Sequence, residues 1–134
     1  MTTTSPETLP IRTSEDIVLV RTAVRKAALS IKLGIVDQTK LVTAASEIAR
    51  NTLDYGGGGQ VSLEILATPK TGVRLVFEDQ GPGIPDIQLA LTDGWTSGSG
   101  MGLGLSGTRR LMDDFELASK PGEGTTVRIT KWSR

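Results

Sequence analysis

The stretch "EIARNTLDYGGGG" (47–59) predicts a helix with an acid and an amide on one face, followed by four glycines. Glu47 and Asn51 are four residues apart, which makes them neighbours on a helix surface. A carboxylate beside an amide oxygen could orient a hydroxyl group and hold Mg²⁺, a cation that prefers oxygen ligands. The alternative is a solvated helix face, on which Arg50 pairs with Glu47 and with Asp54. The glycines are expected to end the helix and to connect it loosely to the next strand.

The periodicity of the rest of the chain predicts three helices and four or five strands. The segment "TSED" (13–16) has the spacing of a capping box, and Asp37 is expected to cap the helix that contains Glu47. The expected elements are a short strand at 7–13, helices at about 15–33, 37–54 and 104–113, a strand hairpin at 60–67 and 72–79, and strands at 114–119 and 125–132. Such elements favour a two-layer α+β domain over residues 8–134, after a flexible lead at 1–7.

Composition excludes several functional classes. The chain has 15 Lys and Arg against 15 Asp and Glu, so the basic surface of a nucleic-acid-binding protein is not expected. No apolar run is long enough to predict a membrane helix. Histidine and cysteine are both absent, which rules out a histidine base, a phospho-accepting histidine and a thiolate metal site. Any chemistry must therefore use carboxylates, hydroxyls, backbone amides or a bound cation.

Two glycine clusters could meet a nucleotide. The segment "GLGLSG" (102–107) matches the dinucleotide fingerprint, but no strand precedes it, and a Rossmann unit is therefore excluded. Glycines before a helix still expose N–H groups that suit phosphate oxygens, although a flexible loop would look the same. In "EDQGPGI" (78–84), Asp79 ends a predicted strand and could accept a hydrogen bond from an exocyclic amine. An ordinary turn after a strand is the alternative.

The order of the motifs is more specific than any one of them. "EIARN", "DQGPGI", "GMGLGL" and "GEGT" follow one another, and together they span most of the chain, about residues 8–132. This series resembles the Bergerat ATP-binding fold of the GHKL superfamily, which includes gyrase, Hsp90-type chaperones, MutL, sensor histidine kinases and bacterial anti-sigma serine kinases. The resemblance implies an α+β fold in which three helices cover one face of a mixed, mostly antiparallel sheet.

Glutamate at position 47 and the absence of histidine place the resemblance within one branch, the serine/threonine switch kinases of bacterial stressosomes. It implies a cytoplasmic enzyme that uses ATP and Mg²⁺. Its expected substrates are Ser or Thr of STAS-domain scaffold and antagonist proteins, and it would then bind a downstream effector such as a phosphatase. An anti-sigma factor, or a nucleotide-gated binding module without kinase activity, is the alternative, and a bare ATPase is a third.

The resemblance also implies a role for individual residues. Glu47 would be the catalytic base, and Asn51 would hold Mg²⁺ together with the ATP phosphates. The implied ATP-binding residues are Asn51, Asp54, Asp79, Gly81, Gly83, Ile84, Gly100, Gly102, Gly104, Leu105 and Thr125. Asp54 occupies a position that varies in the superfamily. Trp95 could anchor a partner or pin the glycine-rich segment to the domain, and Arg109 and Arg110 could meet phosphate, a partner or only solvent.

Overall fold

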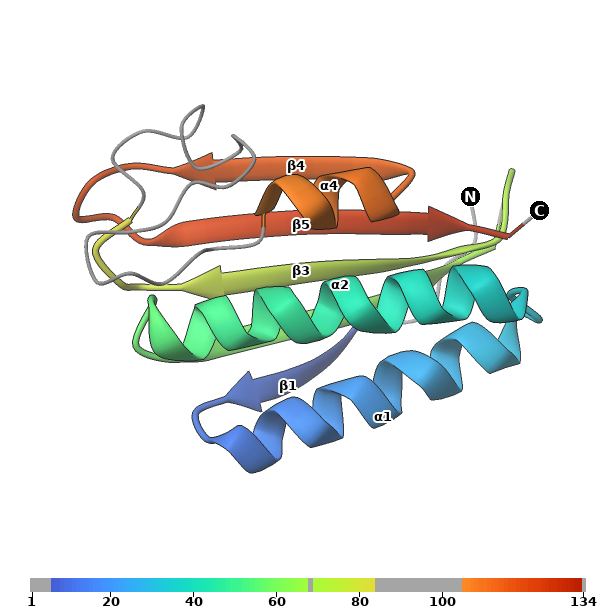
Figure 1. Cartoon of the computed structure of the whole chain (residues 1–134), viewed down its shortest axis with the longest axis horizontal. Coiled ribbons are helices and arrows are strands. Elements are labelled where there is room, and N and C mark those ends of the chain that lie inside the picture. Colours follow the sequence, from blue (N-terminus) through green and yellow to red (C-terminus); the bar gives the residue numbers. More distant parts are fainter. Residues whose placement is uncertain (1–5, 68, 84–104, 134) are drawn as a thin grey trace.

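The computed structural model of this chain describes residues 6–67, 69–83 and 105–133. Eight elements follow one another along these residues (Figure 1). They are β1 (Glu7–Ile11), α1 (Ser14–Ser30), α2 (Ile35–Asp54), β2 (Gly59–Leu66), β3 (Gly72–Asp79), α4 (Leu105–Leu111), β4 (Asp114–Ser119) and β5 (Thr125–Trp132). Within this described part, no helix is both long and apolar enough to cross a membrane.

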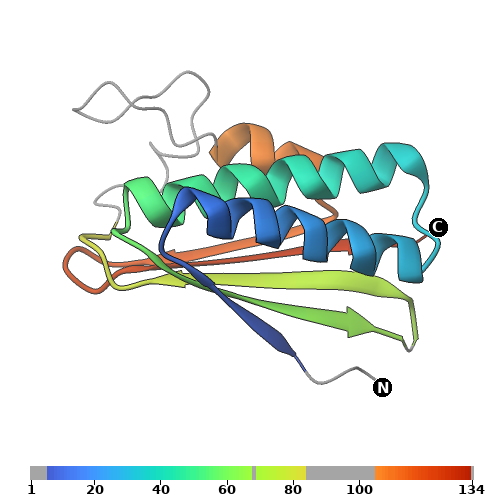
Figure 2. The ribbon, with the colours of Figure 1, turned by 90° about the horizontal axis from the view of Figure 1, so that it is seen from below.

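The five strands form one sheet in the order β1-β2-β3-β5-β4, and its four strand pairings are all antiparallel. The three helices lie together on one face of this sheet (Figure 2). The predicted two-layer α+β architecture with three helices is therefore confirmed. The other sheet face carries polar cross-strand pairs, such as Arg74 with Glu64 and Arg128 with Glu116.

Helix α1 begins where the sequence predicts. The Thr13 side chain accepts a hydrogen bond from the backbone N–H of Asp16, and the Asp16 carboxylate accepts one from the backbone N–H of Thr13, which completes the capping box. The helix ends three residues earlier than expected, because Lys32 adopts a left-handed conformation with φ of 58°. Its buried stripe, Ile17, Val20, Val24, Ala27 and Ala28, faces the sheet.

Helix α2 begins two residues before its expected start. Gly34 is the N-cap residue and provides no side-chain hydrogen bond, so the prediction that Asp37 caps this helix is wrong. Asp37 lies within the first turn instead, where a carboxylate is favoured by the positive end of the helix dipole. Its carboxylate pairs with Lys131 on β5.

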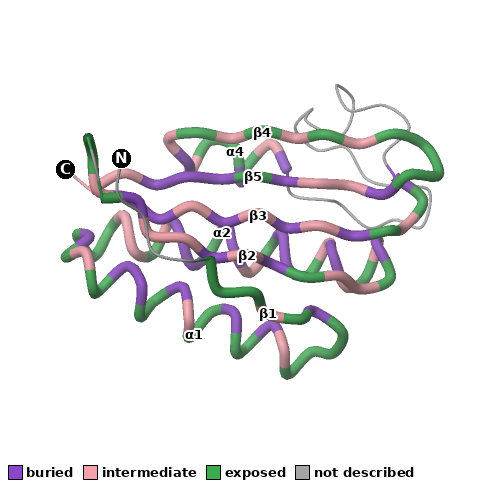
Figure 3. Tube along the Cα trace, turned by 180° about the vertical axis from the view of Figure 1, so that it is seen from behind, coloured by how far each residue is buried: buried purple, intermediate pink, exposed green. Residues whose placement is uncertain are grey.

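The core lies between the helices and the sheet, and Figure 3 shows its buried positions along both layers. On β3, Val73, Leu75 and Phe77 are at most 1% exposed, while the residues between them are half-buried. This alternation places Asp79, the last residue of β3, on the same helix-covered face. The strand pattern thus carries a carboxylate to the end of the apolar layer.

Strand register gathers the chain's polar motifs at one end of the sheet. Asp79 lies opposite Gly59 on β2 and opposite Thr125 on β5, and Thr125 in turn lies opposite Ser119 on β4. The C-terminal end of α2 is at this same end of the sheet, because only Tyr55 and three glycines (56–58) connect it to β2 (Figure 1). Motifs that are far apart in the sequence therefore meet at this one edge.

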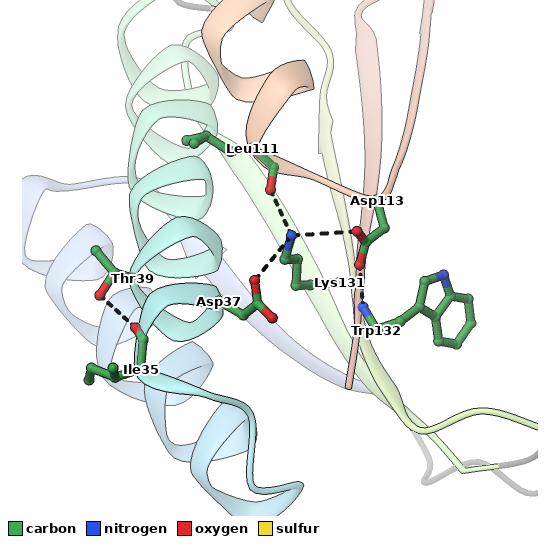
Figure 4. Close-up of polar contacts among 7 residues, drawn as sticks. All are labelled: Ile35, Asp37, Thr39, Leu111, Asp113, Lys131 and Trp132. Atoms are coloured by element: carbon green, nitrogen blue, oxygen red, sulfur yellow. Dashed lines mark hydrogen bonds and ion pairs between the residues drawn. The ribbon is translucent and has the colours of Figure 1, made fainter. Parts of the chain in front are cut away.

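A buried ionic cluster holds the opposite end together (Figure 4). The Lys131 side chain is 4% exposed, and its Nζ lies 3.5 Å from Asp37 on α2 and 3.5 Å from Asp113 before β4. The same Nζ donates to the carbonyl of Leu111, the last residue of α4, at 3.1 Å. Lys131 therefore joins α2, α4 and β5 far from the edge where the motifs meet.

Candidate functional site

A cleft lies between the second half of α2, the last residues of β3, the first residues of β5 and the start of α4. Its lining residues follow the periods of the elements that carry them, with helical spacing on α2 and alternate positions on the strands. They are Ile48, Asn51, Thr52, Tyr55, Phe77, Asp79, Leu105, Thr125 and Val127. The structure thus brings together four of the predicted ATP-binding residues: Asn51, Asp79, Leu105 and Thr125.

Asp79 is the acid of this cleft. Its side chain is on the apolar, helix-covered face of the sheet, and the residue is only 9% exposed. Burial raises the pKa of the Asp79 carboxyl, while hydrogen bonds from the backbone of Gly81 and Thr125 partly oppose this increase. The Gly81 N–H donates to Asp79 Oδ1 at 2.9 Å. A carboxylate fixed in this way can accept a hydrogen bond from a donor on a flat ring that enters the cleft.

Gly56 gives Asp79 its space. It is buried two residues after the end of α2, and a Cβ at this position would lie 2.5 Å from Asp79 Oδ2. The next two glycines have positive φ, and Gly59 already pairs with Asp79 as the first residue of β2. The sequence had suggested only that the glycines end the helix and connect it loosely to the hairpin. The structure gives them a further role. They allow the helix end to pack on the carboxylate.

Gly81 and Gly83 also allow close backbone approach. A Cβ at Gly81 would lie 2.7 Å from the Cα of Gly56, and Gly83 has φ of +76° with its Cα facing the carbonyl of Lys120. The Tyr55 hydroxyl donates to the Gly83 carbonyl at 3.1 Å, which ties the segment after β3 to the end of α2. The structure thus explains both glycines by packing, and their role in accommodating a base remains a prediction.

Glu47 and Asp54 lie outside the cleft lining. Glu47 is exposed one turn before Asn51, and it lines a groove between α1 and α2 that also contains Arg21 and Arg25. Asp54 is exposed at the end of α2, with Oδ2 3.9 Å from Nε of Arg50, as the solvated-face interpretation expected. This geometry does not test the roles that the resemblance implies, which are catalytic base for Glu47 and ATP binding for Asp54.

The remaining predicted residues are on α4 or outside the described part. Arg109 and Arg110 are both exposed in the last turn of α4. Ile84, Gly100, Gly102, Gly104 and Trp95 lie outside the described residues. Their predicted functions in phosphate binding, base binding and partner docking stay predictions.

Five cleft residues were not identified as site residues from the sequence, namely Ile48, Thr52, Tyr55, Phe77 and Val127. A periodic signal was nonetheless present for each. Asn51, Thr52 and Tyr55 are three, four and seven residues after Ile48, which is the spacing of one broad helix face. Phe77 and Val127 are each two residues from a predicted contact on the same strand, and they therefore share its face.

Comparison with known proteins identifies the family to which this chain belongs. Residues 36–133 match the model of the histidine kinase-, DNA gyrase B- and HSP90-like ATPases, and the chain belongs to this family. A structure of the RsbU and RsbW domains of a Mycobacterium tuberculosis protein superposes with a TM-score of 0.67. That comparison has 22% identity and covers 98% of this chain and 33% of the other, so it supports the fold.

The chain is similar to a particular kinase over nearly all of its length. It is 46% identical to the serine/threonine-protein kinase RsbT of Bacillus subtilis, over 92% of this chain and 94% of the relative. It is 29% identical to an anti-sigma F factor of Thermoanaerobacter, over 89% and 87% of the two chains. These matches confirm the predicted GHKL fold and the predicted likeness to the serine/threonine kinase branch.

We expect Asp79→Asn to stabilise the nucleotide-free protein while weakening ATP binding. Because the pKa of Asp79 is raised in the folded state, ionisation of this carboxyl opposes folding at neutral pH. The variant should therefore have the higher melting temperature at pH 7. This gain should shrink as the pH falls through the raised pKa towards the ordinary value of 3.8, because the wild-type carboxyl then becomes neutral. Melting curves across this pH range, with calorimetry of ATP binding at pH 7, measure both effects. A lower melting temperature at pH 7 would contradict the expectation.

Proposed function

We propose that this kinase transfers the γ-phosphate of ATP to Ser or Thr residues of STAS-domain scaffold and antagonist proteins in a bacterial stressosome, and then binds a downstream effector. The likeness to RsbT supports the enzyme class, and likeness to anti-sigma F factors supports a partner-switching role. We expect this protein to act in the cytoplasm, where ATP is available.

The arrangement of α2 carries the proposal. Asn51 lies in the cleft, while Glu47, one turn earlier, faces the groove between α1 and α2. A base for a protein substrate must be reachable from outside the nucleotide cleft and still lie beside it. Glu47 is exposed, and it is one helical turn from Asn51 on α2, and both facts support this role. Glu47 would accept the proton of the incoming hydroxyl as that oxygen attacks.

The chemistry of the cleft lining supports the binding of ATP with a magnesium ion held mainly by the nucleotide. Its lining combines apolar side chains with an acid for the base, Asp79, and one amide, Asn51. Within the described ranges, no group of three or more His, Cys, Asp and Glu could form a metal cage. Mg²⁺ in kinases typically takes few protein ligands and several phosphate oxygens. Asn51 would thus supply the protein's ligand, and bound ATP would supply the transferable phosphate.

Asn51→Ala should lose the part of the ATP affinity that depends on Mg²⁺. The amide oxygen is proposed to bind the cation before any chemistry occurs, so the loss should be seen in ground-state binding. Calorimetric titration with and without Mg²⁺ should give the variant the affinity that the wild type has without the cation. Lys40→Ala, on the same helix but outside the cleft lining, is the matched control. An unchanged response to Mg²⁺ in Asn51→Ala would remove this residue from the metal site.

Incubation with labelled ATP and purified STAS-domain proteins tests the activity directly. Label on a serine or threonine of the STAS protein is the expected result. The similarity to an anti-sigma F factor favours one second candidate, a binding module whose nucleotide only controls docking. Stable complex formation without label would support that candidate, and phosphate release without an acceptor would indicate a bare ATPase.

A further inference from the structure

The Thr125 hydroxyl is hydrogen-bonded to a second hydroxyl, that of Ser119. Ser119, the last residue of β4, lies opposite Thr125 in the sheet. The two hydroxyl oxygens are 2.9 Å apart, and Ser119 Oγ is also 2.9 Å from the carbonyl oxygen of Gly124. Both side chains are only partly exposed, and Thr125 lines the cleft.

Counting hydrogens gives this arrangement a direction. A serine hydroxyl has one hydrogen, and a backbone carbonyl can only accept. If Ser119 donates its hydrogen to the Gly124 carbonyl, the contact between the hydroxyls requires Thr125 to donate to Ser119. Both hydrogen bonds then form with one hydrogen each. If Ser119 donated to Thr125 instead, the Gly124 carbonyl would not receive the Ser119 hydrogen. That contact is part-buried, and a hydrogen bond left unmade there is costly.

We propose that Ser119 is a positioning residue that turns the Thr125 hydroxyl hydrogen away from the cleft and thereby makes Thr125 a hydrogen-bond acceptor towards the bound base. This inference rests on the proposed binding of ATP in the same cleft. Asp79, at the end of β3, presents a carboxylate to the same cleft. Asp79 and Thr125, the first residue of β5, would then both accept hydrogen bonds from the base.

Two neighbouring acceptors discriminate between purines. Adenine has an exocyclic amine with two hydrogens at the position where guanine has a carbonyl. Opposite Asp79 and Thr125 the amine can donate, directly or through a water molecule. The guanine carbonyl would meet like groups that cannot pair with it. A Thr125 hydroxyl that was free to rotate could donate to the guanine carbonyl and relieve part of this mismatch.

Ser119→Ala tests the proposal through the ratio of ATP to GTP affinity. Without an acceptor at position 119, the Thr125 hydrogen is released to the cleft, and we expect the preference for ATP to fall roughly 3–10-fold, the effect of about one hydrogen bond. Ser119→Thr keeps the hydroxyl and should restore the ratio. Thr126→Val, which changes the next residue of β5 on the opposite sheet face, should leave the ratio unchanged.

A double-mutant cycle separates positioning from general damage to the fold. Thr125→Val removes the oriented group itself, so adding Ser119→Ala to it should change the ratio no further. Circular dichroism establishes that each variant is folded, and Ser119→Cys, with a weakly accepting thiol of similar size, replaces Ser119→Ala if the alanine variant is not. An unchanged or larger preference for ATP in the folded Ser119 variant overturns the inference and leaves the proposed function intact. Failure of the wild type to bind ATP overturns both.

Discussion

Glu47→Ala is expected to lower the rate of phosphotransfer roughly 10²–10⁴-fold while most of the ATP affinity remains. The proposed base acts on the acceptor hydroxyl in the transition state, and Glu47 does not line the cleft that would hold the nucleotide. Its removal should therefore affect turnover far more than nucleotide binding. Rates with a labelled STAS-domain acceptor, compared with calorimetric affinity for ATP, measure the two effects separately.

The structure offers a matched control for this substitution. Glu15 is another exposed helical glutamate, in the first turn of α1, and Glu15→Ala should phosphorylate the acceptor at the wild-type rate. Because Glu47 is exposed, its truncation should change stability little, and circular dichroism should show native helix content. If a folded Glu47→Ala protein also phosphorylates at the wild-type rate, this residue is only a surface acid.

Lys131→Met should lower the free energy of unfolding by about 3–5 kcal/mol, because it leaves two half-buried acids without the buried cation that they share. The side chains of Asp37 and Asp113 are 19% and 18% exposed, and the carbonyl of Leu111 would lose its donor as well. For a domain of this size, such a loss corresponds to a decrease of roughly 10–20 °C in melting temperature. Thermal and urea unfolding in the absence of nucleotide measure it.

Arg128→Met is the control for the Lys131 experiment. Arg128 is on the same strand and pairs with Glu116, but its side chain is 45% exposed, so this pair should contribute under about 1 kcal/mol. Adding Asp37→Asn and Asp113→Asn to Lys131→Met should recover much of the stability, because the two negative charges that Lys131 had balanced are then removed. A Lys131→Met protein that loses no more stability than Arg128→Met would show that the cluster contributes little.

Local sequence patterns were sufficient to predict most of the elements. The capping box at Thr13 and the apolar stripe of α1 identified its start, because both depend on residues within a few positions of one another. The start of α2 was misplaced for the opposite reason. Asp37 has the chemistry of an N-cap, but its ion pair is with Lys131, ninety-four positions later, and no local pattern contains this partner.

The site divides in the same way between local pattern and tertiary structure. The sequence by itself determined the types of the site residues and their spacing along each element, because helical and strand periods are properties of the local chain. It also excluded histidine and thiolate chemistry through the absence of both residue types. It could indicate Asp79 and Thr125 separately, each at the edge of a predicted strand.

Only the tertiary structure decided which of these groups meet. The pairing of β3 with β5 places Asp79 opposite Thr125, and the pairing of β4 with β5 adds Ser119. The turn after α2 places Gly56 against the Asp79 carboxyl, whereas Glu47 faces a separate groove. Strand order and register depend on how the whole apolar surface is buried between the two layers, a condition that no short stretch of this chain contains.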